Sequence, residues 1–176
     1  MGQLFTLSEM SKLFKQAVQN AIEQITPELN ELVATTEGRV GYGICVPNPF
    51  EVISSQPYSQ EDLENIAFNG SSNFIFHNSN QAEWATPTRY SKIALGKSLL
   101  ALREKMHTIT IATEEWHLFR PGDCRYGGGV FWKGLVAAIS GFTQKQDHDF
   151  ALELVILIHA EYGKLFNAYR TEDAFI

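Results

Sequence analysis

The residues best suited to chemistry lie in one segment, EEWHLFRPGDCRYGGG, at residues 114–129. It combines carboxylates, an imidazole, an indole, two guanidinium groups, a thiol and a phenol, and it ends in three consecutive glycines. Arginine holds carboxylates through paired, charge-assisted hydrogen bonds, so Arg120 and Arg125 are candidates for binding the acid groups of a ligand. Binding residues concentrate on loops that a rigid scaffold positions. We therefore predict a ligand-binding loop here.

The imidazole and the rings of this loop suit a flat ligand. His117 carries an imidazole that could ligate a metal centre, and Tyr126 and Cys124 are alternative ligands of known type. Trp116 or Phe119 could cover the face of a planar molecule. The competing interpretation is an ordinary loop whose aromatic rings are anchored in the core and whose charges are solvated.

Cys124 raises the alternative of catalysis. A cysteine is nucleophilic as its thiolate, which Arg120 or Arg125 would favour, and His117 could serve as the base. An ordinary loop thiol is the better interpretation, because the sequence fixes no partner for it. The chain contains no G-x-S-x-G elbow, phosphate-binding loop or dinucleotide fingerprint, so no reaction class is indicated.

The histidines and cysteines show no spacing typical of a metal site. The histidines are His77, His107, His117, His148 and His159. We expect no closed zinc site, because metal-binding histidines and cysteines usually recur at short, regular intervals. His107 and His148, at predicted helix ends, are expected to be solvated or capping residues, whereas His159 is expected in the core.

Beyond the loop, the sequence predicts a β-hairpin. Residues 130–132 and 135–139 form its strands, because the intervening Lys133-Gly134 suits a two-residue turn in which glycine supplies a positive φ.

A helix from about residue 144 to 169 should follow the hairpin. Thr143 and Gln146 have the spacing of a capping box. Asp147 and Asp149 lie in the first turn, where negative charge suits the positive end of the helix dipole.

The N-terminal part predicts a helix and two strands. Thr6 and Glu9 form a capping-box pattern at the start of a helix. Pro27 is expected either to end this helix or to start a short second turn. In Val40–Val46, bulky residues alternate with glycine and cysteine, which is typical of a strand with one bare face. A helix or a ligand could approach that bare face closely. Phe50–Ser54 offers the returning strand.

The middle of the chain contains a polar segment, residues 56–86, which we interpret as an ordered insertion or a long loop. We predict that it closes over a ligand pocket or a subunit boundary, because loops of this length are often functional. Asn73–His77 predicts a short strand inside it. Thr86 and Pro87 then cap a helix, and Thr108–Thr113, with alternating threonine and isoleucine, predicts another strand.

The order of glycine cluster, hairpin, small-residue strand and acidic helix start resembles the GlcG/HbpS-like haem-binding family, also found as the C-terminal domain of PduO-type corrinoid adenosyltransferases. That family typically reads GGxP, a short strand, a turn glycine, VGAIGVSG and D-x-x-x-A. The corresponding positions here are Gly128-Gly129, Gly134, Val136–Ile139, and Asp147 with Ala151. LFTLSEMSKLFKQAVQNAIEQ and YSKIALGKSLLALR are similar to its first two helices, so the resemblance covers the chain except roughly residues 56–86.

The resemblance implies a single α+β domain over residues 1–176, with a profilin-like, five-stranded antiparallel sheet and helices packed on its faces. It also implies a small ligand, with haem or a related tetrapyrrole as the candidate cofactor, and a homo-oligomer. His117 would then be the candidate ligand of the haem iron, with Tyr126 or Cys124 as the alternatives. Phe131 replaces the family's proline and would either fill the pocket or offer a stacking wall. Lys97 falls on a basic family position that could meet an acid group, although a solvated lysine is the simpler interpretation. The candidate ligand-binding residues are therefore His117, Arg120, Arg125, Tyr126, Gly128, Gly129, Phe131 and Lys97.

Composition limits the partners. The chain has 176 residues, 44% of them hydrophobic, which suits one globular domain. Its net charge of −6 argues against a nucleic-acid or acidic-membrane surface. No signal segment or membrane span is apparent, and two cysteines fit reduced thiols, so we expect a cytoplasmic protein.

Three functions agree with these patterns. The first is a small-ligand-binding protein of the GlcG/HbpS type. The second is a small-molecule enzyme that reuses this scaffold, with a site built from the 114–129 loop and the insertion. The third is a non-catalytic oligomeric accessory or sensor protein.

Overall fold

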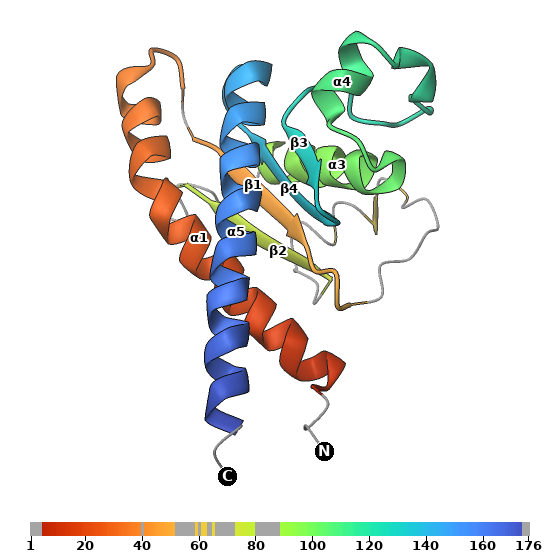
Figure 1. Cartoon of the computed structure of the whole chain (residues 1–176). Coiled ribbons are helices and arrows are strands. Elements are labelled where there is room, and N and C mark those ends of the chain that lie inside the picture. Colours follow the sequence, from red (N-terminus) through yellow and green to blue (C-terminus); the bar gives the residue numbers. More distant parts are fainter. Residues whose placement is uncertain are drawn as a thin grey trace.

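The computed structural model describes residues 5–39, 41–51, 59, 61, 62, 65, 73–79 and 89–173. It shows an α+β fold in which helices cover both faces of an antiparallel sheet (Figure 1). The elements are α1 (Leu7–Thr35), β1 (Gly43–Pro47), β2 (Phe74–Asn78), α3 (Arg89–Glu104), α4 (Thr108–Thr113), the 3-10 helix η1 (Trp116–Leu118), β3 (Gly129–Trp132), β4 (Leu135–Ser140) and α5 (Gln144–Asp173). In the described residues the sheet has four strands in the order β2-β1-β4-β3.

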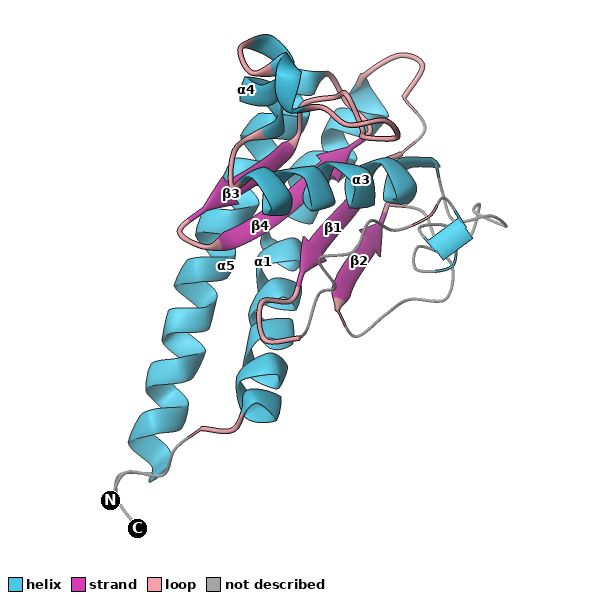
Figure 2. Cartoon of the chain, turned by 90° about the vertical axis from the view of Figure 1, so that its right-hand side faces the viewer, coloured by secondary structure: helices cyan, strands magenta, loops and turns pink. Residues whose placement is uncertain are grey.

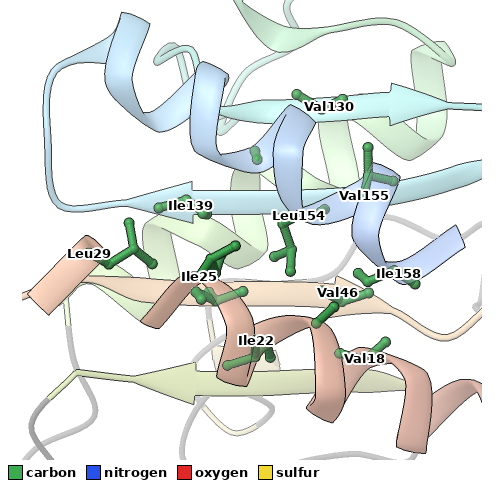
Figure 3. Packing of buried hydrophobic residues seen from close by; sticks show 14 of the residues in the cluster. Val18, Ile22, Ile25, Leu29, Val46, Val130, Ile139, Leu154, Val155 and Ile158 are labelled. Atoms are coloured by element: carbon green, nitrogen blue, oxygen red, sulfur yellow. The ribbon is translucent and has the colours of Figure 1, made fainter. Parts of the chain in front are cut away.

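The two faces of the sheet follow from the alternation of side chains along its strands. Ile44 and Ile139 pack into the main core with α1 and α5, whereas Cys45 and Ala138 face α3 on the other side (Figure 2). Figure 3 shows how the apolar side chains of α1 and α5 meet over the strands. None of the helices in the described ranges contains an apolar stretch long enough to cross a lipid bilayer.

The bare face predicted for the first strand is confirmed, and a helix covers it. A Cβ placed on Gly43 would lie 2.7 Å from the backbone nitrogen of Ser91, so α3 can lie this close to β1 only over a glycine.

Helix α1 begins as predicted but ends later. Thr6 and Glu9 form the capping box, with the Glu9 N–H donating to Thr6 Oγ1 over 3.2 Å. The prediction that Pro27 ends the helix is wrong, because α1 continues to Thr35. Pro27 is exposed, and Ile25 and Leu29 on either side of it are buried in the core. Packing against the sheet and α5 therefore outweighs the hydrogen bond that proline removes.

The prediction of a strand at residues 108–113 is also wrong. This segment is the short helix α4, in which Thr108 and Ile111 are buried on one side. Alternating threonine and isoleucine is typical of a strand, but Thr108 and Ile111, three positions apart, can also lie on one face of a helix. The described sheet therefore has four strands, not the five that the family resemblance implies. The other predicted strand, Phe50–Ser54, lies largely outside the described residues, and Phe50 itself lies in a turn.

The C-terminal predictions are confirmed. Strands β3 and β4 form the hairpin, and Lys133 and Gly134 have φ values of 49° and 83°, as a two-residue primed turn requires. Thr143 and Gln146 form the predicted capping box at the start of α5, with the Gln146 N–H donating to Thr143 Oγ1 over 3.3 Å. The short strand expected at Asn73–His77 is β2.

Most of the 56–86 insertion lies outside the described residues, as does the predicted helix cap of Thr86 and Pro87. Its predicted closure over a pocket or a subunit boundary therefore stays a prediction.

Helix α5 places most of its apolar residues inside the chain. Leu154, Val155 and Ile158 are fully buried against α1 and the sheet, and Ile156 is 43% exposed. Among the described apolar residues of α5, Leu152 and Leu157 are half-buried and Ile156 is exposed, so this helix offers little apolar surface to another subunit.

We nevertheless expect at least a dimer, on the strength of the family resemblance, since closed symmetric dimers are the commonest oligomers. Light scattering coupled to size exclusion, from micromolar protein downward, measures the mass directly. A mass near the monomer value of 19.8 kDa at every concentration would contradict this expectation.

Candidate functional site

The glycine cluster lies where β3, α3 and α5 meet. Gly128 has a φ of +113°, and a Cβ on it would lie 2.6 Å from Asp147 Cβ. A Cβ on Gly129 would lie 2.6 Å from the carbonyl oxygen of Lys97. Side chains at these two positions would therefore clash with the protein itself. The space beside both glycines is filled by protein atoms.

A buried ion pair fills part of this junction. Lys97 Nζ lies 2.7 Å from Asp147 Oδ2, with side chains 1% and 4% exposed. Lys97 Nζ also donates to the Ile139 carbonyl over 2.9 Å, and Asp147 Oδ1 accepts from the Phe142 N–H over 3.0 Å. Burial raises the pKa of Asp147, while Lys97 and the Phe142 amide act in the opposite direction. The interpretation of Lys97 as a solvated lysine is wrong.

The loop between α4 and β3 is held to α3 by Arg103. Its guanidinium makes two hydrogen bonds to Asp123, of 2.9 and 2.7 Å, and a third to the Leu118 carbonyl. Asp123 also accepts from the backbone N–H of Arg120 over 2.6 Å. Partial burial would raise the pKa of Asp123, but the hydrogen bonds and charge of Arg103 outweigh it, so this pKa is lowered. The loop is thus closed on itself and fastened to a helix.

The end of the loop is fixed by side chains that accept hydrogen bonds from the glycine backbone. Gln144 Oε1 accepts from the Gly127 N–H, and Thr108 Oγ1 accepts from the Gly129 N–H, each over 2.9 Å. Sequence reasoning missed Thr108 because it placed this residue in a strand.

Four of the predicted ligand contacts point to solvent. Tyr126 is 56% exposed, the His117 side chain is 63% exposed, and Arg120 and Arg125 are exposed. Within the described part of the chain, neither of these two guanidinium groups makes an ion pair.

Trp116 belongs to the same exposed surface. It is 72% exposed, and its ring centroid lies 6.5 Å from that of His117. The competing interpretation that Trp116 is anchored in the core is therefore wrong. Phe119 is half-buried.

The remaining predicted contacts lie apart from this surface. Lys97, Gly128 and Gly129 belong to the buried junction, and Phe131 is half-buried on β3. Of the eight candidates, four therefore lie on the exposed loop, three belong to the buried junction, and Phe131 lies on β3.

Cys124 does not have the surroundings of an activated nucleophile. Burial raises its pKa, and Lys97, rather than either arginine of the loop, is the cation that opposes this effect. A raised pKa keeps the sulfur as a thiol at neutral pH. Cys45 is buried in the core and its pKa is raised to about 12, and neither cysteine forms a disulfide.

Comparisons with known proteins do not show a family for this chain. No family model and no curated protein matches the chain. The crystal structure of the Klebsiella pneumoniae protein ORFY, of the DUF336 family, aligns with a TM-score of 0.49 and 18% sequence identity. The alignment covers 91% of this chain and 95% of that one. At this level of likeness, function has to be argued from the site itself.

The buried ion pair leads to a stability prediction. Asp147→Asn should lower the free energy of unfolding by about 3–5 kcal/mol, because it leaves the Lys97 charge buried without a partner. Replacing both residues, Lys97→Met with Asp147→Leu, should recover most of that loss. Urea unfolding measures all variants. Asp149→Asn, which removes an exposed carboxylate from the same turn, is the control and should change stability by less than about 1 kcal/mol. If Asp147→Asn and Asp149→Asn lowered the free energy of unfolding equally, burial of the ion pair would not explain the loss.

The raised pKa of Cys124 predicts slow alkylation at neutral pH. In a Cys45→Ala background, the rate with iodoacetamide should keep rising with pH beyond the ordinary thiol pKa of about 8.5, because the thiolate forms only there. A rate that already levels off near pH 7 would show an activated thiolate and would restore the case for catalysis.

Proposed function

We propose that this protein binds a planar, anionic small molecule on the binding loop, which we define as residues 114–126. The observation that carries this proposal is the exposure, on one loop, of Trp116, Tyr126 and the guanidinium groups of Arg120 and Arg125, which make no ion pair among the described residues. Tryptophan, tyrosine and arginine are the side chains that contribute most to binding interfaces. Their gathering in a single loop favours recognition over an ordinary surface.

The fixed backbone of the loop supports the same proposal. Arg103 and Asp123 hold its middle, and Gln144 and Thr108 hold the glycines at its end. Binding loses affinity when a loop must be ordered first, so a fastened loop makes better use of its contacts. Large aromatic rings exposed on a rigid loop are therefore available at low entropic cost.

Haem or a related tetrapyrrole fits this set of side chains, and the family resemblance supports it. Arg120 and Arg125 would bind the two propionates, and Trp116 would lie against the ring. His117 Nδ1 lies 3.6 Å from a Glu115 carboxylate oxygen, which leaves Nε2 for the iron. Histidines that bind metals usually donate their other N–H to such a group, and a small rotation of the exposed His117 side chain would bring this pair within hydrogen-bonding distance. Bound haem would supply an iron centre for ligand binding or electron transfer.

Tyr126 is the second available donor, being exposed on the same loop. Cys124 suits this role less well, because burial raises its pKa and a haem ligand must be a thiolate. These surroundings also favour binding over catalysis, since the thiol was the sole nucleophile proposed for the loop.

Replacing either arginine should weaken haem binding measurably. Arg120→Ala and Arg125→Ala should each cost about 1.5–3 kcal/mol, the scale of hydrogen bonds to charged groups. Titration followed at the Soret band gives the affinities. Arg170→Ala, which removes an exposed cation near the C-terminal end of α5, is the matched control and should leave affinity unchanged.

His117 is tested by comparing haem with iron-free protoporphyrin. His117→Ala should change the spectrum and affinity of the haem complex and leave binding of the iron-free ring nearly unaltered, whereas the arginine variants should weaken both. Unchanged affinity for both molecules in all three variants would place the ligand elsewhere.

A further inference from the structure

Two histidines meet at the base of the binding loop. His107 is the residue before α4, and His148 lies near the start of α5. Their ring centroids are 5.2 Å apart and the ring planes are inclined by 74°. His107 makes no side-chain capping bond, so the expectation of solvated or capping residues does not describe this pair. Both side chains are half-buried, so the pair lies at the surface rather than in the core.

The inner nitrogen of each ring lacks a partner. His107 Nδ1 and His148 Nδ1 are both buried, and neither has a hydrogen-bond partner among the described residues. Buried polar atoms are nearly always paired, so two unpaired nitrogens in contacting rings call for a common explanation, such as an ion. Burial lowers the pKa of both histidines and so favours the neutral form of each ring. A neutral imidazole that carries its hydrogen on Nε2 presents a lone pair at Nδ1.

We propose that His107 and His148 bind a divalent transition ion of the zinc type through their Nδ1 atoms. Imidazole nitrogen is the preferred ligand of Zn²⁺, Ni²⁺ and Cu²⁺, whereas Mg²⁺ and Ca²⁺ require oxygen. Two imidazoles on one tetrahedral zinc ion have nitrogens about 2 Å from the metal, which places their ring centroids roughly 5 Å apart. The observed separation of 5.2 Å agrees with this.

The site would be open, with two protein ligands and water at the remaining positions. Among the described residues, no group of three or more His, Cys, Asp or Glu side chains is placed to hold a metal ion. The charged side chains that influence the pKa of His148 are Lys145 and Asp149, which pair with each other. An open site of this kind differs from the closed zinc site that the spacing of the sequence argued against.

The place of the pair in the chain gives such an ion a structural role. His107 directly precedes Thr108, whose hydroxyl accepts a hydrogen bond from the Gly129 N–H. His148 directly follows Asp147, which forms the buried ion pair with Lys97. A metal between the two rings would join α4 to α5 across the end of the binding loop. The site stands independently of what the loop binds.

Zinc chloride alone is the probe, added to metal-free full-length protein and followed by calorimetry and thermal unfolding. We expect one Zn²⁺ per chain and a higher melting temperature, while Mg²⁺ has no effect. His107→Gln and His148→Gln should each weaken zinc binding about tenfold or more, the scale seen when support of a metal ligand is lost. His159→Gln is the control. His159 lies farther along α5, and its ring centroid is 5.2 Å from that of Trp132 on β3.

Nuclear magnetic resonance of ¹⁵N-labelled histidine identifies the ligating atom in the unaltered protein, so the result does not depend on how the variants fold. Zinc should shift the Nδ1 resonances of His107 and His148 and leave those of His77 and His159 in place. Zinc that binds equally well after both replacements, or shifts confined to other histidines, would overturn the proposal. So would the lack of any zinc-dependent shift or stabilisation.

Discussion

The pairing of Lys97 with Asp147 is the constraint on which the arrangement of the C-terminal half depends. An ion pair this deeply buried is tolerated when its remaining hydrogen-bonding capacity is met, and here Ile139 and Phe142 supply backbone partners. The pair also requires close approach of three elements, which is why Gly128 has no side chain. A helix from the middle of the chain, the end of the hairpin and the start of the last helix are therefore fixed relative to one another by one charge interaction.

This packed junction and the exposed loop have different tasks. The junction is buried and internally paired, so it offers little to a ligand, and it sets the position at which β3 begins. The loop presents aromatic and cationic groups to solvent on a backbone that Arg103 restrains. Binding residues often lie on loops that a rigid scaffold holds in place, because such loops can change in sequence without disturbing the core. The glycines connect the two parts and belong, by their contacts, to the base.

Local chemistry made much of the fold predictable from the sequence, and distant contacts account for what was missed. The Lys133-Gly134 turn and the Thr6 cap were predictable because each involves residues within four positions of one another. The end of α1 was mispredicted at Pro27, because packing of the residues on both sides of the proline keeps the helix intact. The pairing of Lys97 with Asp147 was not predictable, because the two residues are 50 positions apart in the sequence. The loop was recognisable by composition. Its exposure was not, since an indole suits a core as readily as a surface.

The two long helices have a consequence for the topology of the chain. Near the start of α1, the Phe5 ring lies 4.8 Å from Phe166 and 5.1 Å from Tyr169, whose hydroxyl donates to Glu9. The beginning and the end of the described chain are thus neighbours, at the opposite end of the molecule from α4 (Figure 1). The start of α1 and the end of α5 therefore support each other, so that loosening either one exposes the aromatic rings of both.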